Sequence, residues 1–272
     1  MFPLIAFLGL PASLSPWRAL VAFGSAFIAG TINSVAGGGT LLTFPTLIWL
    51  GLPSINANAT STVAIWPGTV GTIWGYRREM RTSSPRMLAL VFPSVVGGIV
   101  GALLLNRTPP AVFDALVPFL ILFATLLFMI QEPIQRRLKI SHPESHKSTR
   151  WLIGAMTFQL FVALYGGYFG AGIGILMLAA LSVLGLTDIH QMNGLKALLG
   201  ASVNGVAALY FIWAGMVNWP LFVVMVVGAI IGGYGGALIA RRIGGPTVRR
   251  IVILVGLSMA ASMFVKFFRT LV

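Results

Sequence analysis

Polar side chains at helical spacing lie inside some of the most apolar runs of this chain, and one of them is charged. Asn193, Lys196 and Asn204 fall on one helical face, and Gly200 leaves space beside the lysine. A charge inside an apolar run is costly to bury and indicates a functional site by default, although a long lysine stem can also reach a nearby interface. One cation between amide groups predicts a site for a small anion.

A second polar face lies in the apolar run that begins near position 58. Asn58, Thr62 and Thr69 recur there at steps of four and seven residues, which places them on one side of a helix. Trp66 joins this face in mid-run, away from the run ends where interfacial tryptophans gather, although core packing is its commoner explanation. We predict that Asn58, Thr62 and Trp66 contribute to the same kind of binding site.

Two longer apolar segments, 17–51 and 151–185, contain glycine clusters and exceed the roughly 20 residues of one membrane crossing. Glycine lets the backbone reverse without steric cost, so we predict a helix break in each segment. Backbone groups freed in lipid must be buried in protein or line a wet cavity, and half-helix N-termini attract anions. We therefore expect the two breaks to meet deep in the bilayer and form one electropositive chamber. The candidate binding residues at the breaks are Asn33, Ser34, Gly38, Gly39, Thr40, Gly170 and Gly172.

Other glycines have a different interpretation, because glycine also allows helices to approach closely in membranes. Gly97 and Gly101 are spaced by four residues, and so are Gly228, Gly232 and Gly236. At these positions the spacing favours helix packing over a break.

The composition indicates that the solvent is lipid. The 272 residues are 57% hydrophobic and 8% charged, against about 25% charged in soluble domains. The 18 Lys and Arg outnumber 5 Asp and Glu. Most of them lie in short connections, which is typical of cytoplasmic loops and argues against a nucleic-acid partner. The chain has no cysteine, and its acids and histidines lie in or next to connections, so we expect no enzyme activity, no metal and no cofactor.

The two halves of the chain correspond in order. Gly38 aligns with Gly172, and Thr62 with Lys196, at an offset of 134 positions. Basic connections orient the spans so that each half has one broken helical hairpin plus three transmembrane helices, which inverts the second half. The fold prediction is an all-α integral membrane protein of two inverted repeats, with a first repeat at 1–131, a basic cytoplasmic linker at 132–150 and a second repeat at 151–272. The predicted full spans are 58–76, 86–105, 111–131, 192–214, 218–240 and 250–268.

Two stretches resemble the paired signatures of the TauE/SafE sulfite exporter family. They are "GTINSVAGGGTLLTFPTLIWLGLPSINANATST" at 30–62 and "YGGYFGAGIGILMLAALSVLGLTDIHQMNGLKALLGASVNGVAALYFIWAGMVNW" at 165–219. The resemblance implies a multi-pass protein of the bacterial inner membrane that moves sulfite, thiosulfate or organosulfonates such as sulfoacetate, mostly outward and in some members inward. The second stretch departs from the pattern, because it reads "GAGIG" and has no run of three glycines.

We predict a secondary transporter that exports a small sulfur-containing anion by alternating access, with that anion and the lipid bilayer as its partners. Export needs no coupling ion, because one negative charge leaving an inside-negative cell gains about 2.3 kcal/mol per 100 mV. The alternatives at this point are an importer with a coupled cation, an anion channel that uses the breaks as a filter, a membrane-embedded enzyme and a structural subunit. The sequence does not predict the oligomeric state.

Overall fold

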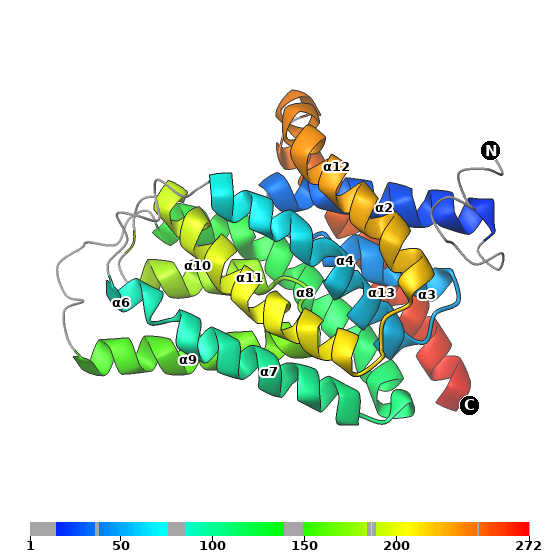
Figure 1. Cartoon of the computed structure of the whole chain (residues 1–272), viewed down its shortest axis with the longest axis horizontal. Coiled ribbons are helices and arrows are strands. Elements are labelled where there is room, and N and C mark those ends of the chain that lie inside the picture. Colours follow the sequence, from blue (N-terminus) through cyan, green and yellow to red (C-terminus); the bar gives the residue numbers. More distant parts are fainter. Residues whose placement is uncertain are drawn as a thin grey trace.

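The computed structural model describes residues 15–35, 38–75, 85–138, 149–183, 186, 189–243 and 245–271, and the elements in these ranges are all helices. Figure 1 shows them as an elongated helical assembly. The first half contains α2 (Pro16–Val35), α3 (Thr40–Trp49), α4 (Ser54–Gly75), α6 (Pro85–Leu88), α7 (Val91–Arg107) and α8 (Pro110–Leu138). The second half contains α9 (Thr149–Tyr168), α10 (Ile173–Val183), α11 (Ile189–Trp213), α12 (Trp219–Ile243) and α13 (Gly245–Leu271). The all-α prediction is confirmed. The six predicted spans overlap α4, α7, α8, α11, α12 and α13, but the span predicted at 86–105 begins in α6 and is interrupted by a turn before α7.

Prolines mark several helix boundaries. Pro16, Pro85 and Pro110 occupy the first positions of α2, α6 and α8, where a missing N–H costs nothing and the fixed φ suits a helix. α7 ends before Thr108, which is extended with φ −73° and ψ 125°, as expected for a residue that precedes a proline. α8 continues through Leu138, into the predicted linker, and linker residues 139–148 lie outside the described residues.

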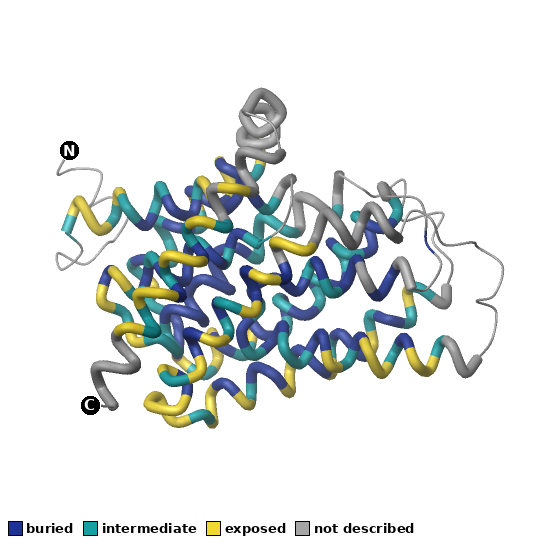
Figure 2. The backbone as a smooth tube through the Cα atoms, turned by 180° about the vertical axis from the view of Figure 1, so that it is seen from behind, coloured by how far each residue is buried: buried dark blue, intermediate teal, exposed yellow. Residues whose placement is uncertain are grey.

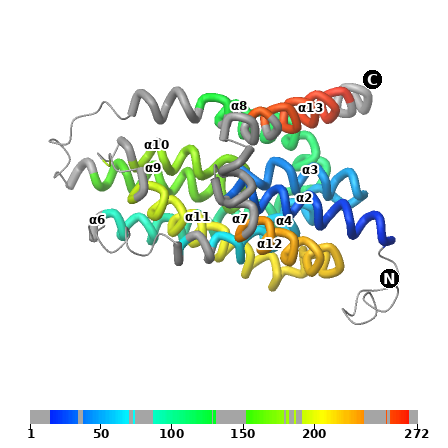
Figure 3. Tube along the Cα trace, turned by 90° about the horizontal axis from the view of Figure 1, so that it is seen from above, coloured from blue at the N-terminus to red at the C-terminus, as the bar shows by residue number. Residues whose placement is uncertain are grey.

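The pattern of helix contacts is the same for both halves, because each helix and its counterpart in the other half have corresponding partners. α2 packs along α12, and α9 packs along α7, so the first helix of each half contacts the fourth long helix of the other. α4 packs on α11 and α8 packs on α13, and the latter pair forms one edge of the molecule in Figure 3. These exchanged partners are what a duplicated unit with two-fold symmetry would produce. The repeat boundaries themselves stay a prediction.

The predicted breaks are present in both halves. Gly38 precedes α3 with φ 95°, and its aligned partner Gly172 precedes α10 with φ 79°, a left-handed conformation that glycine adopts without strain. In the first half the break closes a hairpin. Trp17 at the start of α2 contacts Trp49 at the end of α3, with ring centroids 5.6 Å apart, so the segment enters and leaves at the same end.

Glycines form the closest helix contacts, as the spacing predicts. A Cβ added to Gly232 of α12 would overlap the carbonyl oxygen of Phe27 on α2, and one added to Gly101 of α7 would overlap that of Leu164 on α9. The equivalent contacts at Gly97 and Gly228 would be 2.6 Å from the Leu160 and Phe23 oxygens. Only the helical backbone of Gly236 is described.

The outer surface is apolar, as a lipid-facing surface should be. Phe92, Phe119 and Phe161 are each more than half exposed, and Figure 2 shows such exposed positions along the outer helices around a buried centre. Within the described residues, Pro110–Leu127 and Gln191–Trp213 are long and apolar enough to cross a membrane, and five shorter apolar helices accompany them.

Candidate anion-binding site

The second break, residues 169–172 between α9 and α10, is held by its own hydrogen bonds. The N–H groups of Phe169 and Gly170 both donate to the Tyr165 carbonyl, at 2.9 and 3.3 Å. The Tyr165 hydroxyl donates to the carbonyl of Ala171 at 2.7 Å. The reversal is therefore fixed in place. α10 starts immediately after it, and the first N–H groups of a helix have no partner within that helix.

Lys196 of α11 lies against the first turn of α10. A Cβ added to Gly174 would lie 3.4 Å from Cδ and 3.9 Å from Cγ of Lys196, so the lysine stem packs directly on the first turn of α10. The side chain is partly buried, and its ammonium group has no hydrogen-bond or ion-pair partner among the described residues. Because the N-terminal end of α10 is also positive, this position favours an anion.

Two predicted amide residues flank the same break. The Oδ1 of Asn204 is 3.8 Å from the position of a Cβ on Gly170. Asn58 of α4 donates from Nδ2 to the Tyr168 carbonyl at 3.0 Å and is 1% exposed. Its Oδ1 is buried and has no hydrogen-bond partner among the described residues, which costs about 1–3 kcal/mol unless a donor is supplied. The structure thus gathers Lys196, Asn204 and Asn58 around residues 168–174.

The remaining predicted residues of these faces have different surroundings. Thr62 is buried one turn after Asn58, and Asn193 is partly buried one turn before Lys196. Trp66 donates from Nε1 to the carbonyl of Ala201 at 3.1 Å, and its ring covers Gly205. The one hydrogen-bond donor of the Trp66 side chain is therefore used in a contact between α4 and α11. This matches the core-packing interpretation of Trp66.

At the first break, Asn33 stabilises the turn itself. Its Oδ1 accepts the N–H of Gly39 at 2.8 Å, and a Cβ added to Gly39 would lie 2.5 Å from the Ala29 carbonyl and 2.9 Å from Nδ2 of Asn33. Thr40 begins α3 and is partly buried, whereas the side chain of Ser34 is outside the described residues. The amide oxygen of Asn33 is thus bound to the backbone in this conformation, which leaves only its Nδ2 to donate to an anion.

The Asn33 contact gives a testable prediction. Replacing Asn33 with alanine removes the acceptor for the Gly39 N–H, and we expect a loss of about 1 kcal/mol, as for other capping residues. Thermal unfolding in detergent should show a lower midpoint for Asn33→Ala. Asn106→Ala, which removes the exposed bond to the Tyr210 hydroxyl, should leave the midpoint nearly unchanged, and equal midpoints for all three proteins would contradict the capping role.

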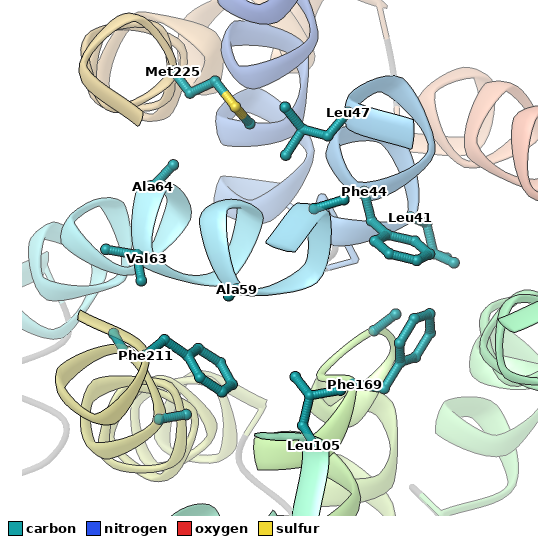
Figure 4. Packing of buried hydrophobic residues seen from close by; sticks show 14 of the residues in the cluster. Leu41, Phe44, Leu47, Ala59, Val63, Ala64, Leu105, Phe169, Phe211 and Met225 are labelled. Atoms are coloured by element: carbon teal, nitrogen blue, oxygen red, sulfur yellow. The ribbon is translucent and has the colours of Figure 1, made fainter. Parts of the chain in front are cut away.

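A pair of buried aromatic side chains joins α3 to the second break. The single shared chamber stays a prediction, because residues 36 and 37 of the first break lie outside the described residues. Phe44 of α3 meets Phe169 edge to face, with ring centroids 5.2 Å apart and an interplanar angle of 88°. Both rings are 1% exposed, and Figure 4 shows them facing each other beside Leu41 and Leu105. The burial of these large side chains stabilises the contact between α3 and the second break.

Sequence reasoning missed the aromatic residues that hold the second break. Tyr165 and Phe169 lie beside glycines in an apolar run, where aromatic side chains are common. The only signal is that each precedes a glycine, Tyr165 before Gly166 and Phe169 before Gly170. Within the described residues, no group of three or more His, Cys, Asp or Glu could hold a metal ion.

Comparisons with known proteins place the chain among membrane transporters. The model of the family described as "Sulfite exporter TauE/SafE" matches residues 22–263. The chain is 29% identical over 251 residues to the "Probable membrane transporter protein YfcA" of Escherichia coli K12, covering 92% of this chain and 91% of the relative. It is 25% identical over 244 residues to a "Probable membrane transporter protein" of Haemophilus influenzae, covering 89% and 93%. No solved structure matches the chain.

Proposed function

Because the chain belongs to the TauE/SafE sulfite exporter family and is a membrane transporter of that type, we propose that it exports a small sulfur-containing anion. The substrate class comprises sulfite, thiosulfate and organosulfonates such as sulfoacetate, and the membrane is the bacterial inner membrane, which the chain crosses several times.

The placement of Lys196 against the first turn of α10 is the observation that carries this proposal. An ammonium group and a helix N-terminus together favour an oxyanion, and Asn204 adds an amide at Gly170. Helix breaks that expose N-termini to anionic substrates are a known arrangement in secondary transporters. Lys196 is the cation of this site, so the binding of a singly charged anion brings the net charge of the site close to zero.

The exchanged helix contacts support alternating access. Each half packs its first helix on the other half, through α2 with α12 and α9 with α7. If the two halves are inverted across the bilayer, rocking of one half against the other exposes the site first on one side and then on the other. The edge-to-face pair of Phe44 and Phe169 would belong to a closed conformation of this cycle.

Counterflow in proteoliposomes tests the proposal. Vesicles that contain the purified protein and are loaded with unlabelled sulfite should take up labelled sulfite transiently, with saturable kinetics. Thiosulfate and sulfoacetate should compete, and simple carboxylates should compete weakly. Single-channel currents without counterflow would favour a channel, and no exchange of any sulfur oxyanion would contradict the proposed function.

The membrane potential should drive the transport. For a singly charged substrate, an inside-negative potential of 100 mV supplies about 2.3 kcal/mol, which shifts the equilibrium distribution outward by about 40-fold at 1.4 kcal/mol per decade. A potassium diffusion potential set with valinomycin tests this on loaded vesicles, with the potential reversed as the control. A distribution that does not respond to the potential would contradict uncoupled export of a net negative charge.

A further inference from the structure

The unpartnered amide oxygen of Asn58 narrows the substrate class. The Nδ2 of Asn58 donates to the Tyr168 carbonyl at 3.0 Å. Because only the amide nitrogen can donate to a carbonyl, this bond fixes the side chain in one orientation. The other atom of the amide, Oδ1, is then an acceptor that is buried and has no donor among the described residues. Buried polar atoms without a partner are rare and call for an explanation.

Asn58 and Lys196 reach the same seven-residue stretch from two helices. Asn58 contacts Tyr168 at the end of α9, whereas the Lys196 stem packs on Gly174 at the start of α10. The Oδ1 of Asn204 lies near Gly170, between these two points. A ligand that bound along the whole of this stretch would meet a cation at one end and an unsatisfied acceptor at the other.

The acceptor requires a group that donates a hydrogen bond. A metal cation is disfavoured there, because Lys196 and the positive end of α10 lie along the same stretch and would repel it. A second anionic group, such as the carboxylate of sulfoacetate, would be repelled by the amide oxygen, so sulfoacetate should bind less tightly than a sulfonate that carries an O–H or N–H group. An O–H or N–H group on the substrate satisfies Oδ1 without adding charge.

Resting on the proposed function, we propose that Asn58 Oδ1 accepts a hydrogen bond from the substrate, so that the preferred substrate is an oxyanion that also carries an O–H or N–H group. Asn58 is then a specificity-determining residue, and Lys196 holds the charge. Hydroxy- and amino-substituted sulfonates have this combination, whereas an alkyl sulfonate carries the anion alone.

Two sulfonates of equal charge separate these contributions. The probes are 2-hydroxyethanesulfonate and ethanesulfonate, tested as inhibitors of labelled sulfite counterflow in proteoliposomes. For the wild type we expect the hydroxylated compound to inhibit at about 10-fold lower concentration, which corresponds to 1.4 kcal/mol. Asn58→Leu should remove this difference and leave inhibition by ethanesulfonate largely unchanged.

Gln159 provides the matched control. It is also a buried amide whose carbonyl oxygen has no partner among the described residues, and its Nε2 donates to Ser94 at 2.8 Å. It lies between the packed helices α9 and α7, away from the break, so Gln159→Leu should keep the 10-fold preference.

The outcomes distinguish this inference from the proposed function. Equal inhibition by the two sulfonates in the wild type overturns the inference, even if Asn58→Leu fails to fold, and so does a preference that survives Asn58→Leu. Inhibition by neither sulfonate overturns it as well, while sulfite counterflow still supports the proposed function. Absence of any anion exchange overturns both.

Discussion

Lys196→Met is expected to abolish sulfite counterflow while the protein still folds. Methionine keeps the length and apolar stem that packs on Gly174, so the variant removes the charge and little else. Removing one partner of a buried charge pair costs about 2–5 kcal/mol, which predicts rates lower by about 30-fold to several thousand-fold. The measurement is the initial rate of labelled sulfite exchange per reconstituted protein.

Arg107→Gln is the control for this prediction. Arg107 is an exposed cation at the end of α7, so its removal lowers the net charge by the same amount without reaching the second break. We expect exchange close to that of the wild type. If both variants lost activity equally, the effect would come from overall charge. If Lys196→Met stayed active, the lysine would have no role in binding.

The second large effect concerns assembly, where we expect Gly232→Ala to destabilise the protein strongly. The new methyl group would overlap the Phe27 carbonyl of α2, and backbone cannot move aside as a flexible side chain can. Overpacking typically costs about 1–3 kcal/mol and occasionally more. Thermal unfolding in detergent and size-exclusion chromatography should show a lower midpoint and aggregation.

Gly24→Ala is the matched variant on the facing helix α2. A Cβ at Gly24 would meet nothing within 4 Å, and alanine favours a helix over glycine by about 0.5–1 kcal/mol. The same chemical change should therefore be neutral or stabilising at Gly24 and damaging at Gly232. Equal stability of the two variants would contradict the close α2–α12 contact.

The sequence predicted the helices and their breaks because lipid imposes simple constraints on length and polarity. An apolar run must approach 20 residues to cross, so the segments 17–51 and 151–185 had to be interrupted, and glycine marked the places. The positive φ at Gly38 and Gly172 confirms both positions. Lys196 was identifiable for a related reason, since a charge in an apolar run is expensive.

The parts that could not be predicted depend on contacts between distant segments. Phe44 and Phe169 are ordinary residues of apolar runs, and nothing in their spacing indicates that they meet across the centre. Asn33 was identified as a polar residue at a break, but its bond to Gly39 depends on how tightly the chain turns. Sequence reasoning could identify candidate residues, whereas their partners required the fold.

The central claim is that a sulfur oxyanion binds at the second break, beside Lys196 and the start of α10. Crystals grown with selenite, which has the pyramidal shape and charge of sulfite, would test it most directly through the anomalous signal of selenium. The account predicts a selenium peak next to the Lys196 ammonium at the N-terminal end of α10, and loss of that peak in Lys196→Met. Selenium found only at exposed arginines, or unchanged in the variant, would contradict it.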